Sequence, residues 1–227
     1  MYLSRVRFTR QGIRDQCRRG LTADLFREHQ MIWSLFDNAP DQQRDFLYRR
    51  EDKPGEPPFY YLLSARPPLE GNDSLTVETK LFAPQLQEGD HLHFQLRVNA
   101  VVTRKVDDHS KRRIRRDIIE AAIDEYRKRD PSGESWPPPT VIHHDAAKRW
   151  LDRQGEKHGF QPGDCLVSNH QFHKLRKPGD ANKRQFTSLD IQGSLTITEA
   201  TTFLTMLQQG LGRSKAFGCG LMLVRRA

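Results

Sequence analysis

Apolar and polar positions alternate at the start of the chain, over residues 2–8, in a stretch that includes β-branched and aromatic side chains. This period of two predicts a β-strand. Residues 11–20 are polar and basic, and we expect them to form a loop. Thr22 or Asp24 can then cap a helix whose apolar residues recur at helical spacing as far as Phe36.

Two more strands are predicted over residues 46–51 and 59–65, on either side of the turn-forming sequence KPGEPP. An irregular connection through residues 67–74 leads to the long alternating run HLHFQLRVNAVVT, which predicts a strand at 91–103. The resulting order is close to the ferredoxin-like βαββαβ plan with a degenerate second helix. We therefore expect an N-terminal domain of this kind at residues 1–104.

The second half of the chain repeats this plan more clearly. Its predicted elements are, in order, a helix at 145–155, strands at 165–175 and 185–197, a helix at 199–209 and a strand at 221–224. Thr198 is expected to cap the second helix and Gly210 to end it. Residues before Asp145 can supply a first strand. We therefore expect a second domain at 144–227, and an α+β fold of two tandem ferredoxin-like (RRM-like) βαββαβ domains.

Residues 105–143 lie between the two predicted copies and are interpreted as a linker or insertion. This region contains the basic run Lys111–Arg116 and a predicted helix at 118–129. Its proline run, Pro137–Pro139, is expected to be extended.

The charge of the chain favours a polyanionic partner. Lys and Arg number 37 against 29 Asp and Glu, which gives a formal net charge of +8. A basic chain of this size suits nucleic acid or an acidic membrane face, although a basic protein without such a partner has the same composition. The position of the charge therefore has to decide between these interpretations.

Cysteine usage and the N-terminal sequence both indicate the cytoplasm. The three cysteines are far apart and form no C-x-x-C motif, which argues against a disulfide scaffold and for a reducing compartment. The first residues show no apolar signal region, and no stretch approaches the roughly 20 apolar residues of a membrane span. We expect a cytoplasmic protein that makes no contact with a membrane.

Basic residues gather in two places, the run Lys111–Arg116 and the flanks of a predicted hairpin tip at 178–180. A two-stranded basic ribbon can lie against the phosphates of a duplex. The alternative is a solvated hairpin whose lysines block edge-to-edge aggregation. The residues of these clusters that we expect to contact RNA are Lys111, Arg112, Lys174, Arg176, Lys177, Lys183 and Arg184.

The segment Gly210–Gly220, GLGRSKAFGCG, is rich in glycine and carries basic side chains. It follows a predicted helix and precedes a strand, the reverse of the order around a Walker A loop, which disfavours a nucleotide-binding enzyme. Glycines allow the backbone to approach a ligand closely, although a helix cap followed by a tightly packed strand has the same pattern. The residues that a phosphate-bearing ligand would contact here are Gly210, Gly212, Arg213, Ser214, Lys215, Gly218 and Gly220.

Histidine is the candidate residue type for catalysis. The chain has nine histidines, and no carboxylate or thiolate partner at metal-ligand spacing is obvious, so neither a metal nor a cofactor is expected. RNA can be cut without a metal, because the ribose 2′-OH can attack the adjacent phosphodiester. A histidine suits a proton transfer in that reaction, and a nearby Lys or Arg can stabilise the developing charge. This chemistry alone does not select one histidine.

Five blocks together resemble the CasE family, the CRISPR-repeat-processing endoribonucleases of the type I-E Cascade complex. They are MYLSRV, LFREHQMIWSLF, DQQRDFLYR, HFQLRVN with Arg97 and Asn99, and QQGLGRSKAFGCGLM. The resemblance covers nearly the whole chain except about residues 117–143. It implies two ferredoxin-like domains and metal-independent cleavage by 2′-OH attack on the 3′ side of a repeat stem-loop. It also implies two kinds of partner, the CRISPR RNA repeat stem-loop and other Cascade subunits.

The resemblance assigns the catalytic role to His29 on the first long helix. A family tyrosine that assists it corresponds to Phe26, which has no hydroxyl group. Arg27 is included among the expected RNA contacts, together with the hairpin and the glycine-rich segment. The missing hydroxyl leaves room for an alternative, a non-catalytic module that binds structured RNA, although no clear RNP motif is present.

Overall fold

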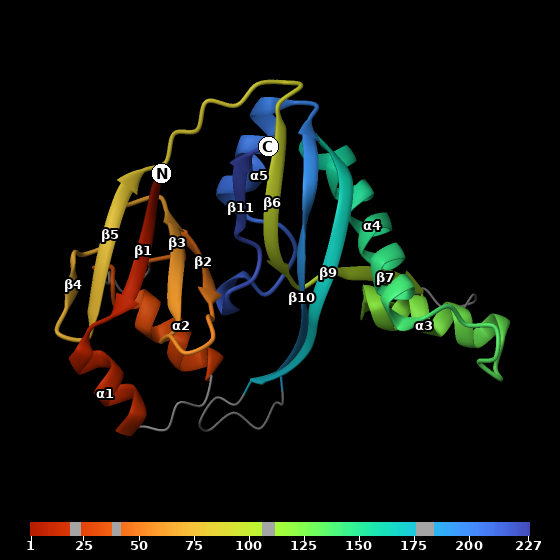
Figure 1. Cartoon of the computed structure of the whole chain (residues 1–227), viewed down its shortest axis with the longest axis horizontal. Helices are drawn as coiled ribbons and strands as arrows, with labels where there is room; N and C mark the ends of the chain where they lie inside the picture. The colour runs from red at the N-terminus through yellow and green to blue at the C-terminus, as the bar shows by residue number, and fades with distance from the viewer. Residues whose placement is uncertain (19–23, 38–41, 106–111, 176–183) are drawn as a thin grey trace.

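In the part of the chain that the structure describes, two large antiparallel β-sheets and a two-stranded ribbon are joined by helices that pack against them (Figure 1). The computed structural model describes residues 1–18, 24–37, 42–105, 112–175 and 184–227. Within these ranges, no helix combines the length and the apolar character needed to cross a membrane.

The first sheet has the strand order β2-β3-β1-β5-β4. Its elements are β1 (Tyr2–Phe8), α1 (Arg10–Arg18), α2 (Leu25–Trp33), β2 (Phe46–Glu51), β3 (Phe59–Ser64), β4 (Gly71–Asn72) and β5 (Leu75–Leu81). The central strand β1 is antiparallel to both β3 and β5. This is a ferredoxin-like unit in which an irregular segment between β3 and β4 stands in place of the second helix, as the sequence predicted.

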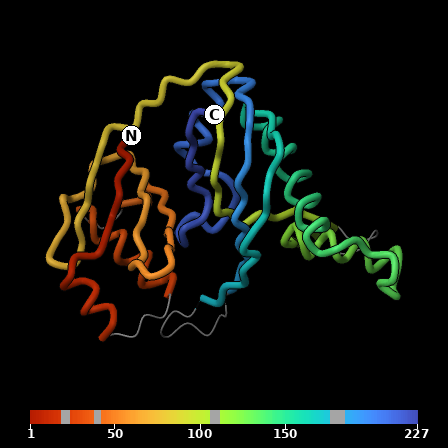
Figure 2. Tube along the Cα trace, viewed as in Figure 1, coloured from red at the N-terminus to blue at the C-terminus, as the bar shows by residue number. Residues whose placement is uncertain are grey.

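The second sheet has the order β11-β6-β10-β9. Its elements are β6 (His91–Val98), α4 (Pro139–His158), β9 (Phe160–Leu175), β10 (Arg184–Ile197), α5 (Ala200–Gln209) and β11 (Met222–Arg226). The first and third strands of the unit lie in the centre, so this copy is a complete ferredoxin-like domain. Figure 2 shows the chain crossing from β5 to β6 between the two units.

The predicted strand at 91–103 does not belong to the first domain. β6 lies between β10 and β11 of the second sheet, and the fourth strand of the first unit is β5, which the sequence analysis passed over. The boundary between the sheets therefore falls between β5 and β6 rather than at residue 104. Alternation identifies a strand, but it does not identify the partner strand, which depends on contacts distant in sequence.

The insertion forms a ribbon and a helix. β7 (Val101–Lys105) pairs with β8 (Arg113–Asp117), and α3 (Ile118–Arg129) follows with the predicted bounds. Asp117 caps α3 by accepting hydrogen bonds from two backbone N–H groups at 2.9 and 3.1 Å. The proline run is not simply extended, because α4 begins at Pro139, where proline at the first helical position loses no hydrogen bond.

Two local predictions are corrected by the structure. Residues 10–18 form the helix α1 rather than a loop, and Thr9 accepts a hydrogen bond from the Gly12 N–H group at its start. The cap of α5 is Glu199 rather than Thr198, because the Glu199 carboxylate accepts from two backbone N–H groups at 2.9 and 2.7 Å. Gly210 ends α5 as predicted and donates to the Met206 carbonyl at 2.7 Å.

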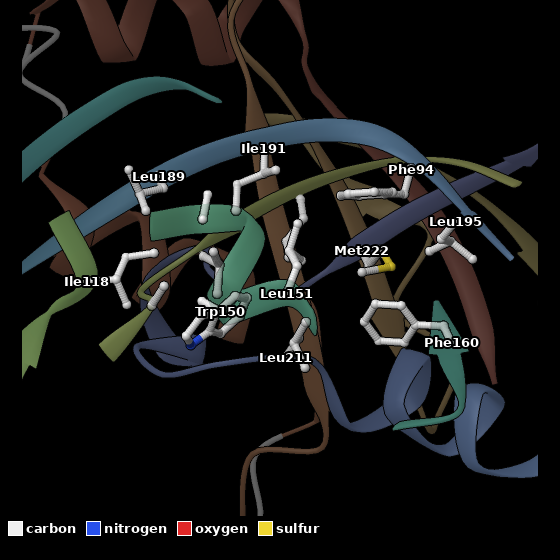
Figure 3. Close-up of a cluster of buried hydrophobic side chains, with 14 of the residues drawn as sticks. Phe94, Ile118, Trp150, Leu151, Phe160, Leu189, Ile191, Leu195, Leu211 and Met222 are labelled. Carbon is white, nitrogen blue, oxygen red and sulfur yellow. The ribbon is translucent and has the colours of Figure 1, made fainter. Parts of the chain in front are cut away.

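Apolar side chains hold each unit together. Figure 3 shows Trp150 and Leu151 of α4 packed beneath Leu189 and Ile191 of β10, inside the core of the second unit. In the first unit Ile32 of α2 is fully buried in a separate cluster against the sheet. Each sheet is therefore covered by its own helix.

A third apolar cluster joins the two units. Leu47 of β2 and Leu63 of β3 are buried together with Leu221, which immediately precedes β11. Neighbouring residues in a strand point to opposite faces, so Tyr48 and Leu62 lie in the cluster with α2 instead. The first sheet thus contacts α2 on one face and the second unit on the other. This packing holds the end of β2 beside the glycine-rich segment, residues 210–220.

Candidate active site

His29 lies on α2, a helix with a well-formed start. The Asp24 carboxylate accepts hydrogen bonds from the backbone N–H groups of Phe26 and Arg27 at 3.0 and 3.4 Å, so Asp24, one of the two predicted candidates, is the N-cap. Ile32 fixes the inner face of the helix in the core. His29, nearly one turn earlier, is half-buried at the edge of that face.

An ion-pair network holds α2 in its orientation. Glu28 is buried and pairs with Arg50 of β2, and Arg50 also pairs with Asp52 at 2.8 Å. Burial raises the pKa of Glu28, and the Arg50 charge opposes this shift. Breaking a buried pair leaves an uncompensated charge, so the contact resists rotation or sliding of the helix. The neighbouring His29 is held in place by the same constraint.

Aromatic rings surround the His29 imidazole. Its ring centroid lies 5.8 Å from that of Trp33, 6.3 Å from that of Phe46 and 6.0 Å from that of Phe217. Phe217 belongs to a 3-10 turn, η1 (Lys215–Phe217), within the glycine-rich segment. The structure therefore brings the predicted catalytic histidine and the predicted glycine-rich segment into contact from opposite ends of the chain.

The environment of His29 favours the neutral imidazole. Burial lowers the pKa of His29, and the positive charge of Arg44 lowers it further, while the Ala216 backbone carbonyl opposes both. The His29 Nδ1 atom is buried and makes no hydrogen bond of good geometry with any of the described residues. A histidine in this state has a lone pair available to accept a proton at neutral pH.

Arg44 is a site residue that the sequence analysis missed. It precedes β2 and donates a hydrogen bond to the Phe46 carbonyl at 2.5 Å. Its side chain therefore lies against the backbone of Phe46, the residue whose ring is near His29. Burial lowers the pKa of Lys215, and the Arg44 charge adds to this shift. Arg44 thus lies within electrostatic range of both His29 and Lys215. In the sequence, Arg44 stands in DQQRDFLYR with no basic neighbour within four residues to mark it.

The glycine-rich segment is fixed to the end of β6. The Asn99 side-chain amide donates to the Ser214 hydroxyl at 2.7 Å, and the Asn99 carbonyl accepts from the Arg213 N–H group at 3.2 Å. Ser214 adopts a left-handed φ of 53°, a conformation that these contacts hold. Gly212 has a φ of 76°, and a Cβ there would lie 2.4 Å from a Val98 methyl group. The loop is therefore built for close packing.

This packing separates the predicted RNA contacts of the segment into two kinds. Arg213 is exposed, and Ser214 and Lys215 are half-buried, with the Lys215 ammonium donating to the Gln209 carbonyl at 2.8 Å. Gly218 and Gly220 are buried. The glycines pack within the loop, Arg213 is exposed to solvent, and Ser214 and Lys215 are held against the protein by hydrogen bonds.

The β9–β10 hairpin contacts the same site. Phe186 of β10 pairs across the strands with His173 of β9, and their rings stack at 4.7 Å. Phe186 also stacks on Phe217 with a centroid distance of 5.9 Å. A continuous row of rings therefore runs from the hairpin through Phe217 to His29.

The remaining predicted RNA contacts lie apart from His29 or outside the described residues. Lys174 is exposed on β9, with its Nζ atom 5.8 Å from the Phe172 ring centroid. Arg112 is exposed immediately before β8, and Arg27 is exposed on α2, where it pairs with Asp24 at 3.5 Å. The predicted contacts outside the described residues are Lys111, Arg176, Lys177 and Lys183, together with the tip at 178–180 and the side chain of Arg184. Within the described ranges, His, Cys, Asp and Glu form no group of three suited to a metal ion.

Comparison with known proteins gives consistent matches over the whole chain. A family model described as CRISPR associated protein matches residues 1–226. The CRISPR system Cascade subunit CasE of Escherichia coli K12 is 30% identical over 224 residues, 98% of each chain. The crystal structure of Cas6e from E. coli K-12 is 27% identical, covers 100% of both chains and has a TM-score of 0.66. Thermus thermophilus Cse3, bound to an RNA representing a pre-cleavage complex, shares the fold at 20% identity and a TM-score of 0.70, over 99% of this chain and 98% of its own.

Proposed function

Because the chain belongs to the CasE family of CRISPR-associated proteins, we propose that it is an endoribonuclease that binds CRISPR repeat stem-loop RNA and cuts it into guide RNA. The observation that carries this proposal is that Arg44 lies within electrostatic range of both His29 and Lys215, where α2 contacts the glycine-rich segment. A group that accepts a proton, together with two cations, is suited to the cleavage of a phosphodiester.

The reaction that fits this cluster needs no metal. Neutral His29 accepts the proton of the ribose 2′-OH, and the 2′-oxygen attacks the adjacent phosphorus. Arg44 and Lys215 stabilise the negative charge of the phosphorane, and the bond to the 5′-oxygen breaks as that oxygen takes a proton from Lys215. The products are a 2′,3′-cyclic phosphate and a 5′-hydroxyl. This assignment gives both proton transfers to His29 and Lys215, so it does not need the hydroxyl that Phe26 lacks.

The β9–β10 hairpin and the polar side chains of residues 213–215 are assigned to RNA binding. The E. coli relative is named as a Cascade subunit, and we propose that this chain likewise stays on the processed RNA within a Cascade complex in the cytoplasm. Lys174 contributes charge to the hairpin face that meets the stem.

The test is cleavage of a repeat stem-loop RNA by the purified full-length chain in excess EDTA. We expect a single cut on the 3′ side of the stem, with a cyclic phosphate and a 5′-hydroxyl at the new ends. An RNA with hydrogen in place of the scissile 2′-OH should bind but stay intact. A requirement for Mg²⁺, or a cut in the 2′-deoxy RNA, would reject the mechanism. Binding without any cut would support a non-catalytic RNA-binding module instead.

A further inference from the structure

A second pocket lies beside the candidate active site, between the glycine-rich segment, α4 and the β7–β8 ribbon. Its volume is about 350 Å³. The titratable side chains that line it are Arg115 of β8, His158 of α4, and Arg213 and Lys215 of the glycine-rich segment. None of the described residues that line the pocket is acidic. A concave site with only basic ionisable groups is suited to an anion.

The arginines of the ribbon are paired differently on its two faces. Arg104 pairs with Glu125, and Arg116 pairs with Asp124 at 2.6 Å, on the side of α3. Arg115 and Arg213, on the pocket side, are exposed and form no ion pair with a carboxylate of the described residues. The ribbon therefore neutralises one face within the protein and presents charge on the other.

Polar groups that can bind a nucleotide complete the lining. The Asn99 and Gln154 amides and the Thr103 hydroxyl contribute donors and acceptors to the wall. Burial lowers the pKa of His158, and the nearby Lys157 and Lys215 charges lower it further, so its ring adds a neutral donor and acceptor. Phosphate contacts position RNA, while such polar groups can reach sugar and base edges.

The position of the pocket indicates which part of an RNA reaches it. Phe217, at one end of η1, contacts His29 and stacks on Phe186 of the hairpin. Lys215, at the other end, lines the pocket. A stem held at the hairpin and cut at His29 would continue past Lys215 as an unpaired strand. We infer that this pocket binds the single-stranded RNA immediately 3′ of the cut, with Arg115 contacting a phosphate of that strand.

This inference rests on the proposed function and gives the basic ribbon of the insertion a role. The pocket would hold the strand that leaves after cleavage, so it would contribute to the binding of uncut RNA but not to the binding of the processed product. The consequence is a difference in affinity between precursor and product, and Arg115 should account for part of it.

The experiment compares the binding of three RNAs to the full chain. All three carry the stem-loop. Any RNA that extends past the cut has hydrogen in place of the scissile 2′-OH, so that it cannot be cleaved during the measurement. One ends at the cut, one continues with an unpaired 3′ strand, and one has an unpaired 5′ strand instead. The variants are Arg115→Gln, Arg115→Lys as a charge-retaining variant, and Arg104→Gln as a control on the other face of the ribbon.

Wild-type protein is expected to bind the 3′-extended RNA most tightly. Arg115→Gln should weaken that binding about three- to tenfold and lower its salt slope by about 0.7, the value for one lost phosphate contact to a single strand, without changing the affinity for the RNA that ends at the cut. Arg115→Lys should retain most of the affinity, and Arg104→Gln should resemble wild type.

An equal loss for all three RNAs, a loss confined to the 5′-extended RNA, or no loss would each overturn the inference. Arg115→Gln could weaken binding of the 3′-extended RNA alone while wild-type protein fails to cut RNA that keeps its 2′-OH. That combination would reject the proposed function and support the pocket assignment.

Discussion

The two ferredoxin-like units share a strand arrangement but make different use of the helix that immediately precedes their second strand. In the second unit that helix is α4, 20 residues long, with Trp150 and Leu151 buried in the core. In the first unit it is α2, nine residues long, which buries Ile32 but leaves His29 at its edge. The same position in the fold therefore serves packing in one copy and the proposed chemistry in the other.

The difference extends to the loops. The first unit has an irregular segment where the second has α5. The first unit contributes His29 and Arg44 to the site. The second unit contributes Lys215 through the segment that follows α5, and the hairpin through β9 and β10. Neither unit contains the cluster alone, so the shared fold does not itself specify the site. The comparison assigns proton transfer to the first unit and RNA positioning to the second, and each assignment can be tested.

The largest effect is expected for His29→Ala. Removing the proton acceptor should lower the cleavage rate by about 10²–10⁴-fold, the usual contribution of a general base, while the affinity for stem-loop RNA stays close to wild type. Single-turnover cleavage and filter binding measure the two quantities. His144→Ala, on the exposed side of α4, is the matched control and should cleave normally. Full activity in His29→Ala would show that His29 of the first unit does not carry out the proposed proton transfer.

Arg44→Gln should have the next largest effect, and it should also change the pH profile. Loss of one cation beside the phosphorane is expected to lower the plateau rate by about 10²-fold. The neutral form of His29 is the active form, so the rate rises with pH through a pKa below the usual 6.5. Removing the Arg44 charge raises that pKa and moves the acid limb of the profile to higher pH.

The pH dependence of single-turnover cleavage measures both changes. Arg44→Lys is the control, because it keeps the positive charge and should leave the acid limb near its wild-type position. An acid limb that stays in place in Arg44→Gln would show that the Arg44 charge does not act on His29.

A smaller effect is expected where the second unit positions the RNA. Phe186 connects the hairpin to Phe217 and so to His29. Phe186→Ala should lower the single-turnover cleavage rate about tenfold with little change in RNA affinity, because a shift of the hairpin misplaces the scissile bond without removing a contact to RNA. Phe186→Tyr should restore the rate. Phe172→Ala removes an exposed ring from the same hairpin and should leave the single-turnover rate unchanged.

If Phe186→Ala weakened RNA binding and left the single-turnover rate unchanged, the ring would be an RNA contact rather than a positioning residue. Equal losses in Phe186→Ala and Phe172→Ala would indicate a general effect on the hairpin. Thermal unfolding of both variants shows whether either has lost stability.

Sequence patterns predicted the elements that carry a strong local signal. The cap at Asp24, the bounds of α3 and the C-cap at Gly210 all follow from a few neighbouring residues, and the structure confirms them. α1 was missed because its only buried residue is Gly12, which packs its backbone against Ser74 and leaves no apolar stripe to detect. Local signals are therefore sufficient only where neighbouring side chains or a turn sequence identify the secondary-structure element.

Non-local relations could not be predicted in this way. β6 alternates as a strand in any sheet, and its pairing with β10 depends on residues far along the chain. Arg44 lies near Lys215 only because β2 packs beside η1. The two residues are far apart in the sequence, so no local pattern could relate them. The glycines of the segment 210–220 are a related case, since the sequence suggested ligand contact and the structure shows them packed against Leu47, Tyr48 and Val98.

The smallest effect is expected for Lys174→Gln on the exposed face of the hairpin. Loss of one phosphate contact should lower the salt slope of stem-loop binding by about one, with only a few-fold loss of affinity. Lys80→Gln, on the exposed edge of the first sheet, removes the same charge from the unit that is not assigned to RNA binding and should leave the slope unchanged. Titration of RNA binding across a range of salt concentrations gives both slopes. Equal slopes in the two variants would mean that the stem lies elsewhere, and that the hairpin holds the active site in shape without contacting the phosphates.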